Sequence, residues 1–342
     1  MGRAVTPRPS TAFTDVDFEK NGRQVGFVML PHSPNDDAWG VTRVPIAVIK
    51  NGAGPTVILE GGNHGDEYEG PIAICELIRE LDPARVQGRL ILMPANNVHA
   101  VMAGQRVSPV DGLNFNRTFP GDPAGTITQQ IAAYVTDHVF PLGDAFFDLH
   151  SGGSSLDILP SAIVEPTDDP DLHRRNVAAV KAFGAPYAVV ISNHGEPRTA
   201  TAAACRAGLV TVGTEMSGAG TVTIDTLKIC RRGVRNVLAH LGVLPHEDAS
   251  PRGGEGELLE IPGSKGFVYA SADGIFEPFH EKGTRVSAGE PAGRIHFTWD
   301  PGRPPEELAY RADGILYGRR QPGRVRPGNC CLVVAAPYGG AL

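Results

Sequence analysis

Apolar residues occur in two different spacings along the first two thirds of the chain. Continuous apolar runs bounded by glycine or proline, such as 55–60 (PTVILE) and 88–95 (GRLILMPA), indicate strands buried on both faces. Between them, segment 70–81 (GPIAICELIREL) has apolar residues at helical spacing, with Pro71 near its start. The pattern therefore predicts buried strands that alternate with amphipathic helices.

The same alternation continues to residue 243. Two segments rich in β-branched residues, 22–30 and 42–50, read as strands that precede it. The further predicted elements are strands at 144–150, 187–192 and 209–218, and helices at 126–140, 171–185, 199–208 and 223–243. Strands interleaved with helices of this length predict an α/β fold, a mixed sheet with helices on both faces.

The pattern changes near residue 250, after which short β-like runs and glycines replace the helices. Two segments of this tail, 272–289 and 312–328, share Ala-Asp-Gly-Ile near the start and a closing glycine. Such a repeat predicts two quasi-equivalent hairpin units in a small all-β domain. We therefore expect two domains: an α/β domain at 1–250, including the N-terminal β segment, and a β-barrel or sandwich-like domain at 251–342.

The repeat is similar to domains that carry lipoyl or biotinyl groups on a lysine beside a methionine. Lys265 and Lys282 lack a neighbouring methionine. We therefore expect the tail to be structural, either as a roof over the active site or as a subunit contact.

Composition narrows the class of protein. A net charge of −7 disfavours a nucleic-acid partner, which needs a basic face. The 5 cysteines have no CxxC spacing, which is typical of reduced thiols in a cytosolic protein. No apolar window reaches the length of a membrane span. We expect a cytoplasmic protein without a membrane or nucleic-acid partner, acting on a small molecule; homo-oligomerisation is left open.

Residues that carry chemistry follow the ends of three predicted strands. His64 and Glu67 lie in a glycine-rich loop after the strand 55–60, His150 ends the strand 144–150, and Glu215 follows an apolar run. Functional groups of open α/β sheets gather beyond the carboxyl ends of the strands. The four side chains are therefore expected at one edge of the sheet.

Two histidines and one carboxylate form the ligand set of several catalytic zinc sites, which leave a fourth position for water. His64, Glu67 and His150 supply this set, and Glu215 would take a proton from the water. The spacing H-x-x-E is weak by itself. His150 also fits a core histidine, and Glu215 also fits a cap of the next helix.

A long polar loop follows the strand 88–95 and carries Arg106, Asn116 and Arg117. Arginine presents a rigid fork of donors that suits carboxylates and developing oxyanions. The alternative is that Arg117 only ties down the loop. His194, just after another predicted strand, is a further candidate for the pocket.

Together these motifs resemble the succinylglutamate desuccinylase/aspartoacylase family, whose members are relatives of the zinc carboxypeptidases. The resemblance covers about residues 40–242, and the tail is similar to the C-terminal domain of that family. Segments 42–71 and 106–121 most resemble bacterial N-acetyl-diaminobutyrate deacetylases of ectoine breakdown. The motifs are His64-Gly-Asp-Glu67, Asn116-Arg117, Asp148-Leu-His150 and Gly-Thr-Glu215.

The resemblance implies a role for each matched residue. His64, Glu67 and His150 would bind one Zn²⁺ per subunit, and Glu215 would be the general base. The pair Asn116 and Arg117 would grip the α-carboxylate of the substrate, and Arg106 would polarise the scissile carbonyl.

The resemblance also implies a zinc-dependent amidohydrolase that removes an acyl group from an N-acylated amino acid. Members that act on succinyl or aspartyl groups use an additional arginine. Neither Arg198 nor Arg206 stands in a motif that aligns, so we favour a neutral acetyl group, as in N-alpha-acetyl-2,4-diaminobutyrate. Three alternatives stay open: a desuccinylase or aspartoacylase, a metallocarboxypeptidase for small peptides, and a non-enzymatic zinc-stabilised scaffold or sensor.

Overall fold

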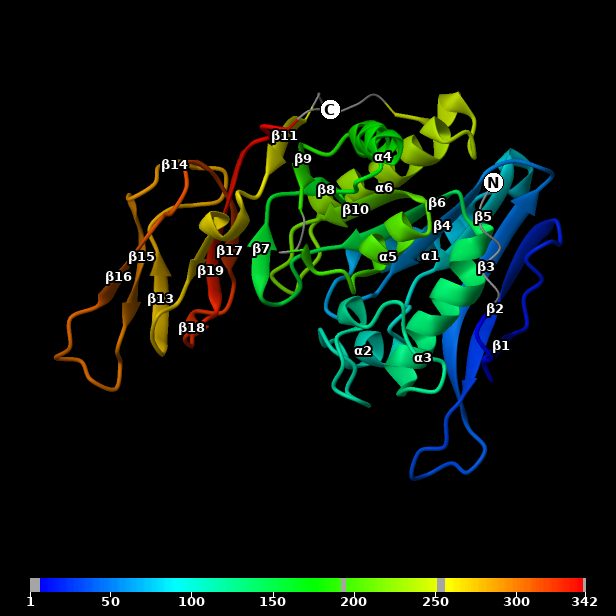
Figure 1. Cartoon of the computed structure of the whole chain (residues 1–342), viewed down its shortest axis with the longest axis horizontal. Helices are drawn as coiled ribbons and strands as arrows, with labels where there is room; N and C mark the ends of the chain where they lie inside the picture. Colours follow the sequence, from blue (N-terminus) through cyan, green and yellow to red (C-terminus); the bar gives the residue numbers. More distant parts are fainter. Residues whose placement is uncertain (1–6, 192–194, 251–255, 341–342) are drawn as a thin grey trace.

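The computed structural model describes residues 7–191, 195–250 and 256–340. Its centre is a large mixed sheet with the strand order β1-β2-β3-β5-β4-β6-β10-β8-β9-β11-β19-β17-β14. A second sheet has the order β16-β15-β13-β18. Figure 1 shows the second sheet at the end of the molecule away from β1–β3. The α/β class with a strand-rich C-terminal region is as the sequence predicts.

The elements have the following bounds. The helices are α1 (Glu69–Glu80), α2 (Val98–Ala103), α3 (Ile127–Tyr134), α4 (Pro170–Phe183), α5 (Ala200–Arg206) and α6 (Ile224–His240). The strands up to β10 are β1 (Phe13–Thr14), β2 (Gly22–Pro31), β3 (Val41–Asn51), β4 (Thr56–Gly61), β5 (Gly88–Met93), β6 (Ala145–His150), β7 (Leu156–Ile158), β8 (Ser161–Val164), β9 (Tyr187–Val190) and β10 (Val210–Glu215). The later strands are β11 (Glu257–Glu260), β12 (Phe267–Tyr269), β13 (Gly274–Pro278), β14 (Arg285–Val286), β15 (Pro291–His296), β16 (Glu306–Ala309), β17 (Gly314–Arg320), β18 (Arg324–Val325) and β19 (Cys330–Pro337).

Helices cover both faces of the central sheet because its strands are apolar on both sides. Leu59 of β4 packs in a core with α1, α4 and α6, whereas the adjacent Ile58 packs in a second core with α3 and α5. Successive strand residues point to opposite faces, so one strand contributes to both cores. This explains the continuous apolar runs in the sequence.

Strands β5, β4, β6 and β10 are mutually parallel at the centre of the sheet. Gly61 pairs with Leu149, and Glu215 pairs with His150. The three strands β4, β6 and β10 therefore end at the same level, and the loops after them meet at one edge.

The repeat in the tail is real, but its units are not hairpins. The long strand of each unit, β13 or β17, pairs with the short strand of the other unit, β18 or β14. The two units therefore interlock. The predicted hairpins are wrong because the pairing partner of each strand lies in the other copy of the repeat.

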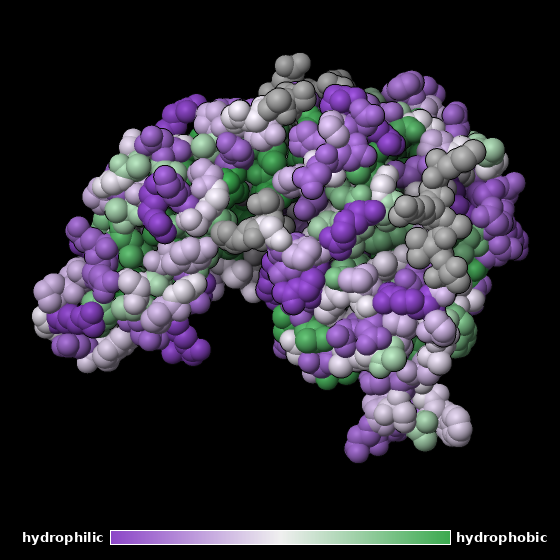
Figure 2. Space-filling view, viewed as in Figure 1, coloured by the Kyte–Doolittle hydropathy of each residue, from purple (hydrophilic) through white to green (hydrophobic). Residues whose placement is uncertain are grey.

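The C-terminal strands join the central sheet directly. β11 pairs with both β9 and β19, and β17 pairs with β7. The space-filling view shows apolar side chains where these strands adjoin the rest of the molecule, and further apolar patches elsewhere on a largely polar face (Figure 2). The predicted boundary at residue 250 stays a prediction, and residues 251–255 lie outside the described part.

The structure adds elements that the sequence analysis did not assign, namely α2, β1, β7 and β8. The predicted helix 126–140 is shorter as an α-helix: α3 ends at Tyr134, and a π-turn (Val135–Val139) and a 3₁₀ turn (Phe140–Leu142) follow it. Every cysteine is free. Among the described residues, we find no helix with the length and apolarity needed to span a membrane.

Candidate active site

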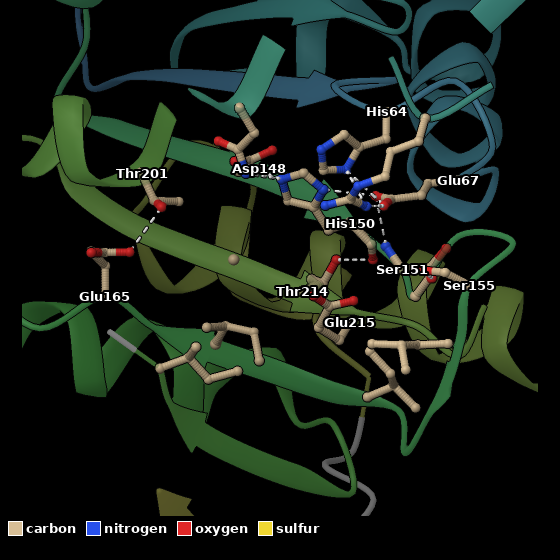
Figure 3. Close-up of a pocket in the computed structure, with 18 of the residues that line it drawn as sticks. His64, Glu67, Asp148, His150, Ser151, Ser155, Glu165, Thr201, Thr214 and Glu215 are labelled. Carbon is tan, nitrogen blue, oxygen red and sulfur yellow. Dashed lines mark hydrogen bonds and ion pairs between the residues drawn. The ribbon is translucent and has the colours of Figure 1, made fainter. Parts of the chain in front are cut away.

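A cavity of about 320 Å³ lies at the carboxyl ends of β4, β6 and β10. Figure 3 shows side chains from these strands and their following loops pointing toward one another around it. The cavity is lined by the seven residues to which the sequence analysis gave a role in the site: His64, Glu67, Arg106, Asn116, Arg117, His150 and Glu215. The expectation that separate strand ends gather these residues is met. Their individual roles stay predictions.

The loop between β4 and α1 places His64 and Glu67 by means of its glycines. Gly62 has a φ of +67°, a left-handed conformation that glycine adopts without strain. A Cβ on Gly65 would lie 1.9 Å from the carbonyl oxygen of Ala100. Only glycine fits there, so the loop turns tightly against α2 and directs both side chains into the cavity.

Glu67 faces one histidine with each of its carboxylate oxygens. Its Oε1 lies 2.8 Å from Nδ1 of His64, and its Oε2 lies 2.7 Å from Nδ1 of His150. The two imidazole rings are tilted, with centroids 5.0 Å apart. One ligand atom from each residue lies within 4.8 Å of the others. The three side chains can therefore share one cation.

The second ring nitrogen of each histidine is held by an oxygen. Nε2 of His64 lies 3.1 Å from Oδ1 of Asn114, and Nε2 of His150 lies 3.0 Å from Oδ2 of Asp148. An oxygen at Nε2 fixes the ring proton there and turns Nδ1 toward the shared centre, as in many metal-binding histidines. Two imidazole nitrogens and a carboxylate fit Zn²⁺ or a similar divalent cation.

The charges of His64, Glu67 and His150, which we call the trio, depend on one another. Burial alone would raise the pKa of Glu67, but His64 and His150 outweigh burial and hold that pKa well below its ordinary value. Burial opposes a charge on His150, yet Asp148 and Glu67 raise its pKa well above the usual value. Burial lowers the pKa of His64. A metal ion must therefore displace a proton from His150.

Glu215 ends β10 beside His150. Its Oε2 is buried and has no hydrogen-bond partner among the described residues. Burial, and then the negative charge of Glu67, raises the pKa of Glu215 to about 8. The alternative role as a helix cap is wrong, because the side chain of Thr223 caps α6 by accepting a hydrogen bond from the backbone N–H of Thr226. Glu215 is thus a carboxyl group that is free to exchange a proton.

Two arginines reach the cavity from the loop after α2. Nη1 of Arg106 lies 3.4 Å from Nδ1 of His64 and 3.5 Å from Oε1 of Glu67. Arg117 donates from Nη1 to the carbonyl oxygen of Asn116, so it does tie down the loop, but it also lines the cavity. Burial and the nearby charge of Arg106 lower the pKa of Arg117. Two neighbouring guanidinium groups favour an anion between them.

The amide of Asn116 is turned toward the protein. Its Oδ1 accepts a hydrogen bond of 2.8 Å from the backbone N–H of Ala200, and its Nδ2 lies 3.2 Å from Nε2 of His150. In this structure the amide oxygen of Asn116 is therefore held by the first residue of α5, and its Nδ2 lies beside the ring of His150 rather than pointing freely toward a ligand.

Glu165 and Thr201 also line the cavity, and the sequence analysis did not single them out. Glu165 directly follows β8, and Oγ1 of Thr201 donates a hydrogen bond of 2.9 Å to Oε2 of Glu165. The segment Ser-Ala-Ile-Val before Glu165 has the same form as the other strand ends, an apolar run followed by a carboxylate. That signal could have found it. His194 lies outside the described residues.

Known proteins match this chain over most of its length. Residues 53–241 match the family described as Succinylglutamate desuccinylase/Aspartoacylase catalytic domain. The chain belongs to the succinylglutamate desuccinylase/aspartoacylase family. A relative of this family from Halomonas elongata, named N-alpha-acetyl-L-2,4-diaminobutyric acid deacetylase, is 41% identical over 329 residues, which are 96% of this chain and 96% of the relative.

Solved structures of desuccinylase/aspartoacylase family members share the fold. The structure described as succinylglutamatedesuccinylase/aspartoacylase from Rhodobacter sphaeroides has a TM-score of 0.91 and 44% identity, covering 97% of this chain and 100% of that chain. A product-bound structure of the Ectoine utilization protein EutE (DoeB) from Ruegeria pomeroyi has a TM-score of 0.92 and 38% identity, covering 96% of this chain and 100% of that one. The predicted family and fold class are confirmed.

Proposed function

We propose that this protein is a zinc-dependent amidohydrolase that removes an acetyl group from the α-amine of an amino acid. The observation that carries the proposal is the meeting of His64, Glu67 and His150 with the unpaired carboxyl of Glu215 in one small cavity. The name of the Halomonas elongata relative supports Nα-acetyl-L-2,4-diaminobutyrate as the substrate.

His64, Glu67 and His150 would hold the zinc ion. When bound, zinc supplies a Lewis acid that polarises an amide carbonyl and lowers the pKa of water toward about 7. Burial holds the pKa of Glu215 high, and the positive charge of a bound zinc ion would lower it, so that Glu215 could accept a proton from water and then give it to the departing amine. Arg106, next to the trio, would donate to the carbonyl oxygen as it gains negative charge.

Binding of the amino-acid part is assigned to Arg117, whose guanidinium lines the cavity. A charged fork at this place can hold the α-carboxylate and thereby orient the amide for attack. Asn116 would support the site through its contacts with His150 and Ala200. The chain's own residues thus cover proton transfer, carbonyl stabilisation and substrate orientation.

The charges around the cavity favour a neutral acyl group. Among the described residues, the arginines that line it are Arg106 and Arg117. Arg198 is paired with Glu196 and Arg206 is exposed, and neither lines the cavity. A succinyl or aspartyl carboxylate would therefore lack a third cation. The volume of about 320 Å³ is also near the lower end of ligand pockets, about 300–1,000 Å³, which disfavours peptides.

A substrate panel with separate variation of acyl group and amino acid tests this proposal. We expect acetate release from Nα-acetyl-L-2,4-diaminobutyrate, and at least about tenfold lower kcat/KM for the Nα-succinyl compound and for a dipeptide. Faster cleavage of the dipeptide would overturn the deacetylase assignment in favour of a carboxypeptidase.

Metal analysis of the purified protein tests the cofactor. We expect one zinc ion per chain, loss of activity after chelation, and recovery when zinc is restored. Activity that is unchanged in a metal-free preparation would contradict the proposal. A closed coordination by four protein atoms, seen by X-ray absorption, would instead favour the scaffold alternative.

A further inference from the structure

The cavity has a second end, away from the metal-binding trio, where a single carboxylate lies. Figure 3 shows Glu165 and Thr201 at the side of the cavity opposite Glu67. Glu165 is 9% exposed and lines the cavity together with the apolar side chains of Ile163 and Ile191. The mechanism proposed above gives Glu165 no role.

Glu165 has an incomplete set of partners. Its Oε2 accepts a hydrogen bond from Oγ1 of Thr201, whereas no partner of Oε1 is found among the described residues. No lysine or arginine of the described chain lies within ion-pairing distance of it; the charge of Arg206 acts only from farther away. Burial raises the pKa of Glu165 to about 7. A buried carboxylate without a counter-charge is unfavourable, and a bound cation would relieve this.

From this arrangement we infer that Glu165 binds an ammonium group at the end of the substrate's amino-acid side chain. It would thereby select a cationic diamino acid over neutral and acidic amino acids. The inference rests on the proposed function and specifies its substrate class. Thr201, by holding Oε2, would keep the carboxylate turned toward the ligand.

The strand register places Glu165 at a suitable distance. Ile163 lies opposite Gly213 in the antiparallel pair of β8 and β10. Glu215 comes two residues after Gly213, and Glu165 comes two residues after Ile163. Because the two strands run in opposite directions, Glu215 and Glu165 are separated by four residues along the sheet. At about 3.3 Å per residue, the backbones of Glu165 and Glu215 are about 13 Å apart along the strands.

A short diamino acid matches this separation. Five bonds join the acetyl carbonyl carbon of Nα-acetyl-2,4-diaminobutyrate to its terminal nitrogen, about 6 Å when extended. A contact of about 3 Å at each end brings the reach to about 12 Å. Arg117 for the carboxylate, the trio for the amide and Glu165 for the ammonium group would then contact the three polar parts of one molecule.

The test compares two substrates that differ only in charge. Nα-acetyl-L-norvaline has a methyl group where Nα-acetyl-L-2,4-diaminobutyrate has its ammonium group. We expect Glu165→Gln to lower kcat/KM for the diaminobutyrate compound by about 30- to 100-fold, mainly through KM, and to change kcat/KM for the norvaline compound by less than about threefold. Glu307→Gln, at an exposed position of β16, is the matched control and should change neither.

Equal losses on both substrates would overturn the inference, because a merely structural Glu165 would affect both alike. A wild-type protein that hydrolyses both compounds equally well would also overturn it, while leaving the deacetylase function intact. If neither compound is hydrolysed, the proposed function fails. Calorimetric binding of the free amino acids still decides the role of Glu165: the wild type should bind L-2,4-diaminobutyrate at least about tenfold more tightly than L-norvaline, and Glu165→Gln should not.

Discussion

The two ends of the cavity differ in how their polar groups are paired. At one end, Glu67 contacts His64, His150 and the backbone N–H of Ser151 through its two oxygens. At the other end, within the described part of the chain, Glu165 has one hydrogen bond, from Thr201. Both carboxylates are buried, yet one lies in a network of donors and the other has no counter-charge among the residues that the structure describes.

This difference suggests that the proposed reaction and the choice of substrate depend on different ends of the cavity. A network such as that around Glu67 holds each side chain in one orientation, whatever substrate is present. A carboxylate with spare acceptor capacity interacts strongly only with a ligand that brings its own positive charge. Substitutions at the Glu67 end should therefore lower the activity on all substrates. Substitutions at the Glu165 end should lower the activity only on substrates with a positive charge.

The largest effect is expected for Glu215→Gln. The amide keeps the size of the side chain but cannot accept a proton, so kcat should fall by about 1,000-fold or more for every substrate. The zinc content should stay at one ion per chain, because Glu215 is not in the proposed ligand set of His64, Glu67 and His150. Loss of zinc in this variant would mean that Glu215 is a ligand and not the base.

Arg117→Gln should have the next largest effect. Loss of a charged donor to the α-carboxylate should raise KM by about 30- to 100-fold. Because every N-acyl amino acid carries this carboxylate, the increase should be the same for the diaminobutyrate and norvaline compounds. Steady-state kinetics with both compounds checks this. If KM rose for only one of the two compounds, Arg117 would not bind the α-carboxylate that both share, and its effect would not differ in kind from that of Glu165→Gln.

Asp148→Asn tests the support of the metal-binding trio. Loss of the negative charge beside Nε2 of His150 should weaken zinc binding by about 10- to 100-fold. The measurement is a competition titration against a chelator at pH 9, where protonation of His150 competes least. An unchanged zinc affinity would show that Asp148 does not orient the ligand.

Glu165→Gln should change stability in a pH-dependent way and by a smaller amount. The folded-state pKa of Glu165, about 7, is above the reference value of 4.5, so its protonated form favours folding. That contribution is complete below pH 4.5 and is lost as pH rises through 7. The variant without metal should therefore be more stable than the wild type by less than about 1 kcal/mol at pH 5 and by about 3 kcal/mol at pH 8. Urea unfolding at both pH values measures this; equal differences at both would contradict it.

Sequence patterns predicted which side chains meet at one end of the cavity. Each of His64, His150 and Glu215 comes at the end of an apolar run, and parallel strands place their ends at one edge. The sequence predicted that Glu67 and the two histidines meet, but not that each carboxylate oxygen faces one histidine, because that geometry depends on the tight turn at Gly62 and Gly65 against α2.

The other end of the cavity was missed for a topological reason. β8 is short and runs antiparallel to β10, so the residue after it points back along the cavity rather than to the common edge. The rule that functional residues follow the carboxyl ends of parallel strands does not apply to an antiparallel strand such as β8. The pairing between the two repeats of the tail was missed because sequence similarity shows equivalence of the units but not which strands of them form hydrogen bonds.

The strand pairing of β7 with β17 has a consequence for access to the cavity. Leu156 and Ile158 line the cavity from β7, and their strand is hydrogen-bonded to the C-terminal segment. Moving that segment away from the cavity would break the hydrogen bonds between β7 and β17. We therefore expect the entrance of the cavity to keep a constant width and to exclude bulky molecules.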